Sequence, residues 1–444
     1  MLRKLIAFTL LVGATYAPAE SYVFTNGNLV TMNSPAATAG ELVAVDGKIA
    51  AVGQNLPRPG GAVVVDMDGG YLMPGLAEMH AHVPSPSLGL AYRDEVLFLW
   101  VAWGITTARG MLGHPDHLAL RDDLLAHKVL GPRLFTSGPS FNSNSVRSVA
   151  RAVQMVEEQH RLGYDFLKIH PGMNRAQFDA MAATAHRLRI AFAGHVPADV
   201  GLTQALSEGQ LTIDHLDGFV QELVPNLKAN DPALNSFFAA ALVDQADETM
   251  ADPIIRKMLE ARAWVVPTET LFENFAAADD IDELSARPEI IYLPQSLRDN
   301  YTRALSGAAS SAAATQRYVE LRKRMLKAMH DHGVGILLGS DSPQIFNVPG
   351  FSIHRELRAM VSAGLSPYEA LQTGTVNPEK FFGRDNEVGR LAAGLVADLV
   401  LVAGNPLQDI SNAANVKGVM VRGRWLDSNE RSRKLAEIAK RYAN

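Results

Sequence analysis

The stretch Tyr164-Asp165-Phe166-Leu167-Lys168-Ile169-His170 is a short, mostly apolar run with polar residues at its carboxyl end. Seven further runs follow this pattern, and longer stretches of helical periodicity lie between them. Such alternation of short strands and helices is typical of a parallel sheet. Eight units predict a TIM-like (β/α)8 barrel of the α/β class, with strands at residues 76–82, 105–109, 133–137, 164–170, 190–195, 211–215, 263–267 and 334–341.

Apolar residues recur at three- and four-residue spacing between these strands, which indicates helices packed against a sheet. We predict helices at residues 146–162, 175–188 and 315–332. Two other stretches, 217–262 and 271–307, are longer than a barrel requires. We expect these insertions to lie over the barrel mouth as lids or substrate walls.

The two ends of the chain have a different texture, rich in short strands. Residues 21–73 alternate apolar and polar side chains around the turn signals Asn26-Gly27 and Asp46-Gly47. Similar runs return near the carboxyl terminus. We therefore predict a composite β-sandwich domain from residues 20–73 and 387–430, a barrel from residues 74–386, and a C-terminal helix at residues 431–444.

Residues 1–19 have the pattern of a secretory signal peptide, with Arg3 and Lys4 before an apolar core and small residues at 17–19. A membrane anchor is the alternative, although the apolar run is shorter than the roughly 18 residues that a span requires. The chain has no cysteine, which excludes disulfides and thiolate metal ligands. We expect an exported bacterial protein, periplasmic or secreted.

Composition places few limits on function. The sequence is 47% hydrophobic and 20% charged, with a net charge of -6, as in an ordinary globular protein. The charge balance shows no excess of basic residues that would indicate nucleic-acid binding. We expect a small-molecule or short-peptide partner, no nucleic acid, and no membrane after signal cleavage, with a homo-oligomer left open.

Histidines and one aspartate follow several predicted strands. His80 and His82 are two residues apart, so both point to the same side of their strand. His195, His215 and Asp341 end three other strands, and the carboxyl ends of barrel strands converge on the active site. Imidazole and carboxylate ligands suit Zn²⁺, with Mn²⁺, Co²⁺ or Fe²⁺ as alternatives.

Lys168 lies among these residues in strand order. A capping or salt-bridged lysine is one interpretation, but a protonated amine would repel metal ions. Reaction with CO2 would convert Lys168 to N6-carboxylysine, an anion that can bridge two ions. The sequence therefore predicts a two-metal hydrolytic site.

Several motifs resemble the amidohydrolase superfamily over nearly the whole mature chain. They are PGL at residues 74–76, HAH at 80–82 and GRLAAGLVADLVL at 389–401. The resemblance is to the imidazolonepropionase-related branch that includes Xaa-Pro dipeptidases. It implies that His80, His82 and Asp341 hold one ion, that His195 and His215 hold the other, and that carboxylated Lys168 bridges the two.

Four further phrases resemble secreted bacterial amidohydrolases that hydrolyse ochratoxin A, an N-acyl phenylalanine. They are GPSFNSN at residues 138–144, LKIHPG at 167–172, GHVP at 194–197 and SDSPQIFNVPGFSIHREL at 340–357. Two positions depart from the family pattern. Glu78 replaces a usual aspartate, and Asn142-Ser143-Asn144-Ser145 replaces the glycine-glycine-histidine of several dipeptidases, so an amide or hydroxyl is expected to polarise the carbonyl there.

We expect substrate contacts from residues near the barrel mouth, namely Ser85, His170, Asn144 and His354. His354, Arg355 and Arg109 are also candidates to bind a substrate carboxylate, with surface ion pairs as the alternative.

The predicted function is a binuclear, carboxypeptidase- or dipeptidase-like amide hydrolase that releases a C-terminal amino acid from N-acyl amino acids or small peptides, with ochratoxin A as one candidate. A metal-bridging hydroxide would attack the carbonyl, and Asp341 would carry the proton to the departing amine. A lactonase or phosphotriesterase-like esterase is the enzymatic alternative. A non-catalytic periplasmic protein that binds metal or ligand is the alternative of another class.

Overall fold

The computed structural model describes residues 20–308 and 311–443. The predicted signal peptide, residues 1–19, lies outside the described residues. In the described part, every helix is too short or too polar to cross a membrane.

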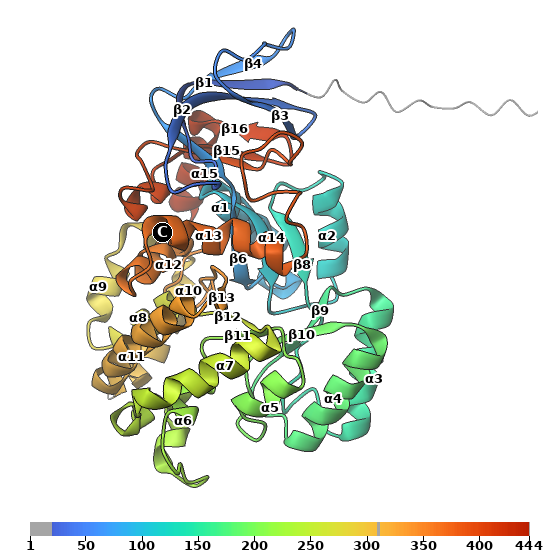
Figure 1. The fold of residues 1–444 in the computed structure, drawn as a ribbon, viewed down its shortest axis with the longest axis vertical. Coiled ribbons are helices and arrows are strands. Elements are labelled where there is room, and N and C mark those ends of the chain that lie inside the picture. Colours follow the sequence, from blue (N-terminus) through green and yellow to red (C-terminus); the bar gives the residue numbers. More distant parts are fainter. Residues whose placement is uncertain (1–19, 309–310, 444) are drawn as a thin grey trace, which may run out of the picture.

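The two ends of the chain build one eight-stranded mixed sheet, at the top of Figure 1. Its path is β16-β15-β14-β5-β1-β2-β3, and β4 pairs with β1. The ends meet where β5 and β14 pair antiparallel, with Leu72 opposite Leu401. Phe24, Leu42 and Met420 join both leucines in one buried cluster. The strands are β1 Tyr22–Leu29, β2 Thr38–Val45, β3 Lys48–Gly53, β4 Val63–Asp66, β5 Tyr71–Pro74, β14 Leu399–Val402, β15 Val416–Val421 and β16 Arg424–Leu426.

Parallel strands occupy the middle of the chain, as the sequence predicts. Three form the sheet β6-β7-β8 and five form the sheet β13-β12-β11-β10-β9. Each lies within one of the eight predicted runs or extends it by one residue. The strands are β6 Leu76–Ala81, β7 Ile105–Gly110, β8 Arg133–Thr136, β9 Phe166–Ile169, β10 Ala191–Gly194, β11 Thr212–Asp214, β12 Trp264–Val266 and β13 Gly335–Ile336.

Further backbone contacts lie at the two borders between these sheets. Ser137, after β8, forms a parallel bridge with Phe166 of β9. On the other border, the amide of Met79 in β6 donates to Leu338 O, 2.8 Å away, beyond the end of β13.

Most of the parallel strands end before the polar residue that closes the corresponding predicted run. The predicted strand at 334–341 is reduced to Gly335–Ile336, although Asp341 N still donates to His80 O at 3.0 Å. Asp341 itself is not extended, since it has a left-handed φ of 59°. His215 also leaves its strand with a φ of 64°.

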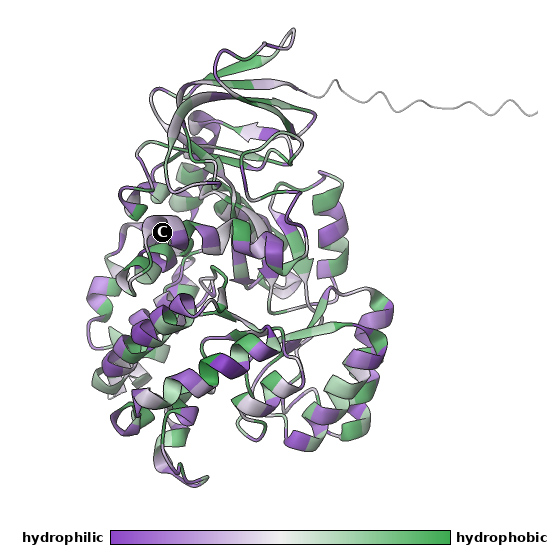
Figure 2. Ribbon diagram, in the orientation of Figure 1, coloured by the Kyte–Doolittle hydropathy of each residue, from purple (hydrophilic) through white to green (hydrophobic). Residues whose placement is uncertain are grey.

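Helices surround the parallel strands, and Figure 2 shows many of them striped in hydrophilic and hydrophobic residues. α4 has the predicted bounds, while α3 begins at Val149 because Ser148 accepts a cap from Arg151 N. These outer helices are α1 Leu90–Ala102, α2 His117–Leu125, α3 Val149–Leu162, α4 Arg175–Leu188, α5 Leu202–Ser207, α7 Ala251–Ala261, α11 Ala312–Asp331, α12 Ser352–Ser362, α13 Pro367–Gly374, α14 Val376–Phe381 and α15 Ser428–Arg441.

The two predicted insertions are short helices and turns. The first contains α6 Phe219–Glu222 and 3-10 turns at Pro232–Asn235, Phe237–Gln245 and Glu248–Met250. Its last part is α7, an amphipathic helix that buries Ile255 and Met258. The second contains α8 Glu269–Ala276, α9 Ile281–Ser285, a 3-10 turn at Pro288–Tyr292 and α10 Gln295–Ala308, and it packs against Phe346 and Val348 beyond β13.

Candidate active site

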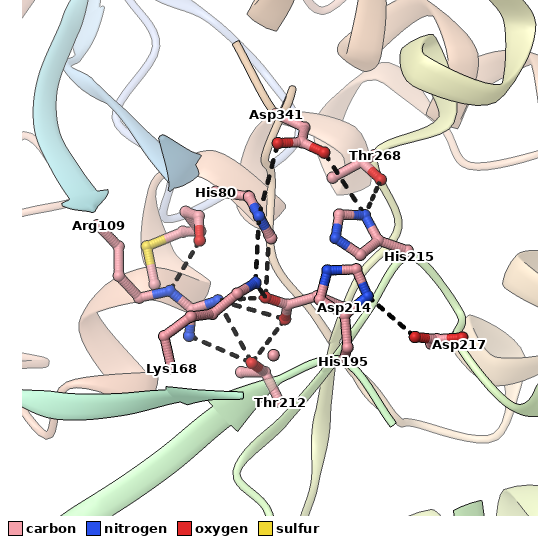
Figure 3. Close-up of polar contacts among 12 residues, drawn as sticks. His80, Arg109, Lys168, His195, Thr212, Asp214, His215, Asp217, Thr268 and Asp341 are labelled. Carbon is pink, nitrogen blue, oxygen red and sulfur yellow. Dashed lines mark hydrogen bonds and ion pairs between the residues drawn. The ribbon is translucent and has the colours of Figure 1, made fainter. Parts of the chain in front are cut away.

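The structure gathers all six predicted metal-site residues at the carboxyl ends of the parallel strands. His80 is in β6 and Lys168 in β9, whereas His82, His195, His215 and Asp341 follow their strands. In the view of Figure 3, Asp341 lies above His80 and His215, with Lys168 and Asp214 below. Five of the six side chains are buried, and His82 is partly exposed.

His80, His82 and Asp341 form a compact group. Their ligand atoms all lie within 4.8 Å of one another. Asp341 Oδ1 is 3.0 Å from His82 Nε2 and 3.6 Å from His80 Nε2. This carboxylate oxygen is buried yet accepts no hydrogen bond. A buried, unpartnered oxygen facing two imidazole nitrogens suits a divalent ion.

Lys168 and the other two histidines adjoin this group. Lys168 Nζ lies 3.4 Å from His80 Nε2 and 3.8 Å from Asp214 Oδ2. The ring centres of His80 and His215 are 4.5 Å apart, and those of His215 and His195 are 4.6 Å apart. Burial lowers the pKa of Lys168 to about 8, although Asp214 and Asp341 favour its charged form.

Each of these two histidines has a partner for its Nδ1 atom. His195 Nδ1 is 3.0 Å from Asp217 Oδ2, and His215 Nδ1 is 2.8 Å from Thr268 Oγ1. A partner at Nδ1 fixes the ring and directs Nε2 toward a ligand position. The arrangement therefore suits metal coordination through Nε2.

Asp214 is a buried carboxylate beneath the site. Its Oδ2 lies 2.9 Å from His80 Nδ1, and its Oδ1 accepts a hydrogen bond from Thr212 Oγ1 at 2.6 Å. Burial favours a raised pKa for Asp214, but the charges of Arg109 and Lys168 outweigh it and lower the pKa. Asp214 therefore supplies negative charge to both His80 and Lys168.

Glu78 links the strand of His80 to the loop of Asp341. It is buried and accepts hydrogen bonds from the amides of His80 and Ser340, at 3.0 and 2.8 Å. Burial raises the pKa of Glu78 to about 8 despite these hydrogen bonds. The departure from the family pattern thus lies beside the candidate ligands.

Arg322 of α11 fixes the turns that carry His215 and Thr268. Its guanidinium donates to His215 O at 2.5 Å and to Pro267 O at 2.6 Å, and it pairs with Glu269. His215 and Thr268 both have left-handed φ values, 64° and 53°. Such backbone persists where the surroundings hold it, and it is common at functional sites.

The predicted substrate contacts lie in different surroundings. The His170 ring centre is 4.9 Å from that of His195. Ser85 pairs with Ser87, at 2.6 Å between their hydroxyls, and Asn144 is exposed on the loop after β8. The structure does not bring His354 to the cluster, because its buried ring donates from Nε2 to Trp103 O at 2.9 Å.

The two arginine candidates for a substrate carboxylate already have partners. Arg109 is buried and donates to Met79 O at 2.7 Å and toward Asp214 at 3.4 Å. Arg355 pairs with Glu289. Arg355 thus forms an ion pair, as the alternative interpretation expects, whereas the contacts of Arg109 are buried rather than at the surface.

Sequence reasoning missed Asp214, Asp217 and Thr268. For Asp214 a signal existed, since it directly precedes His215 at the end of a predicted strand. Thr268 also had a signal, because it directly follows the seventh predicted strand, at residues 263–267. Asp217 carries no pattern of its own, because only the turn after β11 brings it to His195.

Two curated relatives align over much of the chain. Adenine deaminase of Mesorhizobium japonicum is 24% identical over 404 residues, 87% of this chain and 54% of the relative. Ochratoxinase of Aspergillus niger is 25% identical over 330 residues, 69% of this chain and 55% of the relative. The chain thus spans about half the length of these curated relatives.

Solved structures share the fold. The crystal structure of a Xaa-Pro dipeptidase with methionine in its active site has a TM-score of 0.68 and 19% identity, and the alignment covers 92% of this chain and 100% of that chain. The sequence model of the Amidohydrolase family matches residues 71–426. Because this match includes all eight parallel strands and all six candidate ligands, the chain belongs to the amidohydrolase family, as its motifs predict.

Proposed function

We propose that this protein is a metal-dependent amide hydrolase that releases a C-terminal amino acid from N-acyl amino acids or short peptides, with ochratoxin A as a candidate substrate. The observation that carries the proposal is the compact group of His80, His82 and Asp341 with Lys168 Nζ only 3.4 Å from His80 Nε2. The names of the relatives, a deaminase and an ochratoxinase, support hydrolysis at a C–N bond.

The proposal includes a closed (β/α)8 barrel and a terminal β-sandwich, with the predicted domain bounds. Contacts at both borders between the parallel sheets support closure, at Ser137 with Phe166 and at Met79 with Leu338. Closure would bring the ends of β6 and β13 together, and that is where His80 and Asp341 lie.

In this proposal His80, His82 and Asp341 hold one ion and His195 and His215 the other, with Zn²⁺ the expected metal. Carboxylated Lys168 would bridge them. Carboxylation needs a neutral amine, and the lowered pKa of Lys168, about 8, makes the neutral form more accessible near neutral pH than it is for an ordinary lysine. The ions would supply an activated water and a Lewis acid for the carbonyl.

Asp341 is the proposed proton shuttle. Gln344 Nε2 donates to its Oδ2 at 2.5 Å, which fixes the carboxylate, while Oδ1 faces the histidines without a hydrogen bond. A carboxylate fixed at one oxygen can accept a proton and deliver it to the departing amine without leaving the site. Of the predicted substrate contacts, the position of His170 beside His195 supports a role most directly.

We also propose that the protein is exported, since residues 1–19 have the signal pattern.

The proposed activity is tested with zinc-loaded protein without residues 1–19, which should release amino acids from a panel of N-acyl amino acids and dipeptides. The panel also contains ochratoxin A, lactones, phosphotriesters and adenine. Turnover of lactones or phosphotriesters alone would favour an esterase, and ammonia from adenine alone would favour a deaminase. Ligand binding without any turnover would favour a binding protein.

A further inference from the structure

The 3-10 turn Phe237–Gln245 brings a phenyl ring to the candidate site. The Phe238 ring centre lies 5.9 Å from that of His195, with 28° between the ring planes. It lies 5.5 Å from that of His215, with 65° between the planes. The Phe238 side chain is only partly buried.

A second aromatic residue, Phe272, packs against the Phe238 ring. The ring centres of Phe238 and Phe272 are 5.0 Å apart, in an edge-on arrangement. Phe272 is fully buried, and the Arg322 guanidinium lies over its face at 3.5 Å. Because Arg322 also donates to His215 O, one arginine fixes both the backbone of His215 and the support of Phe238.

The backbone of the turn is held in an unfavourable conformation. Phe238 and the next residue, Ala239, have φ values of 47° and 55°, in the left-handed region that non-glycine residues rarely adopt. Ser236 fixes the turn, since its carbonyl accepts from Ala239 N at 2.9 Å and its hydroxyl from Ala241 N at 3.0 Å. Strain of this kind persists where the position of a side chain is fixed by its surroundings.

Ion pairs attach this turn and the following 3-10 turn, Glu248–Met250, to α11. Arg317 donates two hydrogen bonds of 2.8 Å to Asp244, and Arg324 forms a bidentate pair with Glu248. Paired contacts of this geometry fix orientation as well as distance. These contacts hold the turn that carries Phe238 against α11.

We infer that Phe238 forms an aromatic-binding subsite beside His195 and His215, and that the preferred substrates carry a planar aromatic ring next to the scissile amide. The inference rests on the proposed amide hydrolase function and specifies its substrate class. A phenyl face accepts another ring in stacked or edge-on contact more favourably than an aliphatic group of similar size.

The test compares substrates matched in size. N-acetyl-phenylalanine and N-acetyl-cyclohexylalanine differ on the amine side of the amide, and N-benzoylglycine and N-cyclohexanecarbonylglycine differ on the acyl side. We expect the wild type to prefer the aromatic member of at least one pair, and Phe238→Ala to reduce that ratio of kcat/KM by roughly tenfold. Phe275→Leu is the matched control, because Phe275 packs on Phe237 and should leave the ratio unchanged.

Equal losses for both members of each pair, or a preference that persists in Phe238→Ala, would overturn the inference. Phe238→Leu keeps most of the volume and should also lose the preference, which guards against misfolding of the alanine variant. If the wild type cleaves no amide, the proposed function fails separately. Calorimetric binding of the same four ligands then decides: an aromatic preference that depends on Phe238 supports the subsite, and equal affinities refute it.

Discussion

The two halves of the candidate site are built differently. His80, His82 and Asp341 are joined through the backbone, since Asp341 N donates to His80 O at 3.0 Å and His82 N to Ser342 O at 2.9 Å. His195 and His215 lie on neighbouring strand ends and depend on side-chain partners, Asp217 and Thr268. Within residues 20–308 and 311–443, only the first half meets as a compact group of histidine and acidic ligands.

The first half thus presents three ligands in one compact group, whereas the second offers two histidines and, in the proposed arrangement, would need carboxylated Lys168 as a further ligand. The amine lies 3.4 Å from His80 Nε2 and 3.8 Å from Asp214 Oδ2. We therefore expect the first ion to bind independently and the second to depend on carboxylation.

Asp341→Asn should have the largest effect, because Asp341 belongs to the first half and is also the proposed proton carrier. We expect turnover to fall roughly 10³-fold, within the range of general acid–base contributions. Metal analysis accompanies the kinetics, since the amide oxygen can still serve as a ligand and at least one ion should remain. Turnover near that of the wild type would exclude Asp341 as the shuttle.

Lys168→Ala tests the division between the halves directly. We expect metal content to drop from two ions per chain to one, and activity to fall about 10²-fold or more, since loss of the bridging ligand leaves the second ion with two histidines. Added acetate or propionate should restore part of both, because a small carboxylate can enter the space left by the side chain. Lys168→Met fills that space and serves as the control that should not respond. Full activity with a single ion would refute the two-metal proposal.

Asp217→Asn should weaken the second half alone. Loss of a carboxylate that orients a ligating histidine typically costs 10–100-fold in metal affinity, so the second ion should dissociate at lower chelator concentration while the first stays bound. Asp199→Asn, an exposed position on the same loop as His195, is the matched control. Simultaneous release of both ions would show that the halves are not independent.

The same contrast explains what the sequence could predict. His80, His82, His195, His215 and Asp341 follow strands whose apolar runs are visible, so strand order alone brings them to one face. The partners of the histidines depend on irregular backbone after the strands, as at His215 and Thr268, where φ is positive. Periodicity carries no information about such turns. His354 failed to reach the cluster because α12 turns its ring toward Trp103, a contact between segments far apart in the chain.

The pH dependence of carboxylation offers the finest test of the two halves. Burial lowers the pKa of Lys168 from 10.5 to about 8, so the metal-free protein holds mostly protonated amine below pH 8 and mostly neutral amine above it. Only the neutral amine reacts with CO2, and each pH unit below 8 reduces its fraction about tenfold. At a fixed concentration of dissolved CO2, the initial rate of ¹³C incorporation measured by NMR should rise with pH and level off above 8, with Lys168→Met as the blank. Binding of the first ion should not follow this curve, and a shared midpoint for both would mean that Lys168 governs the whole site.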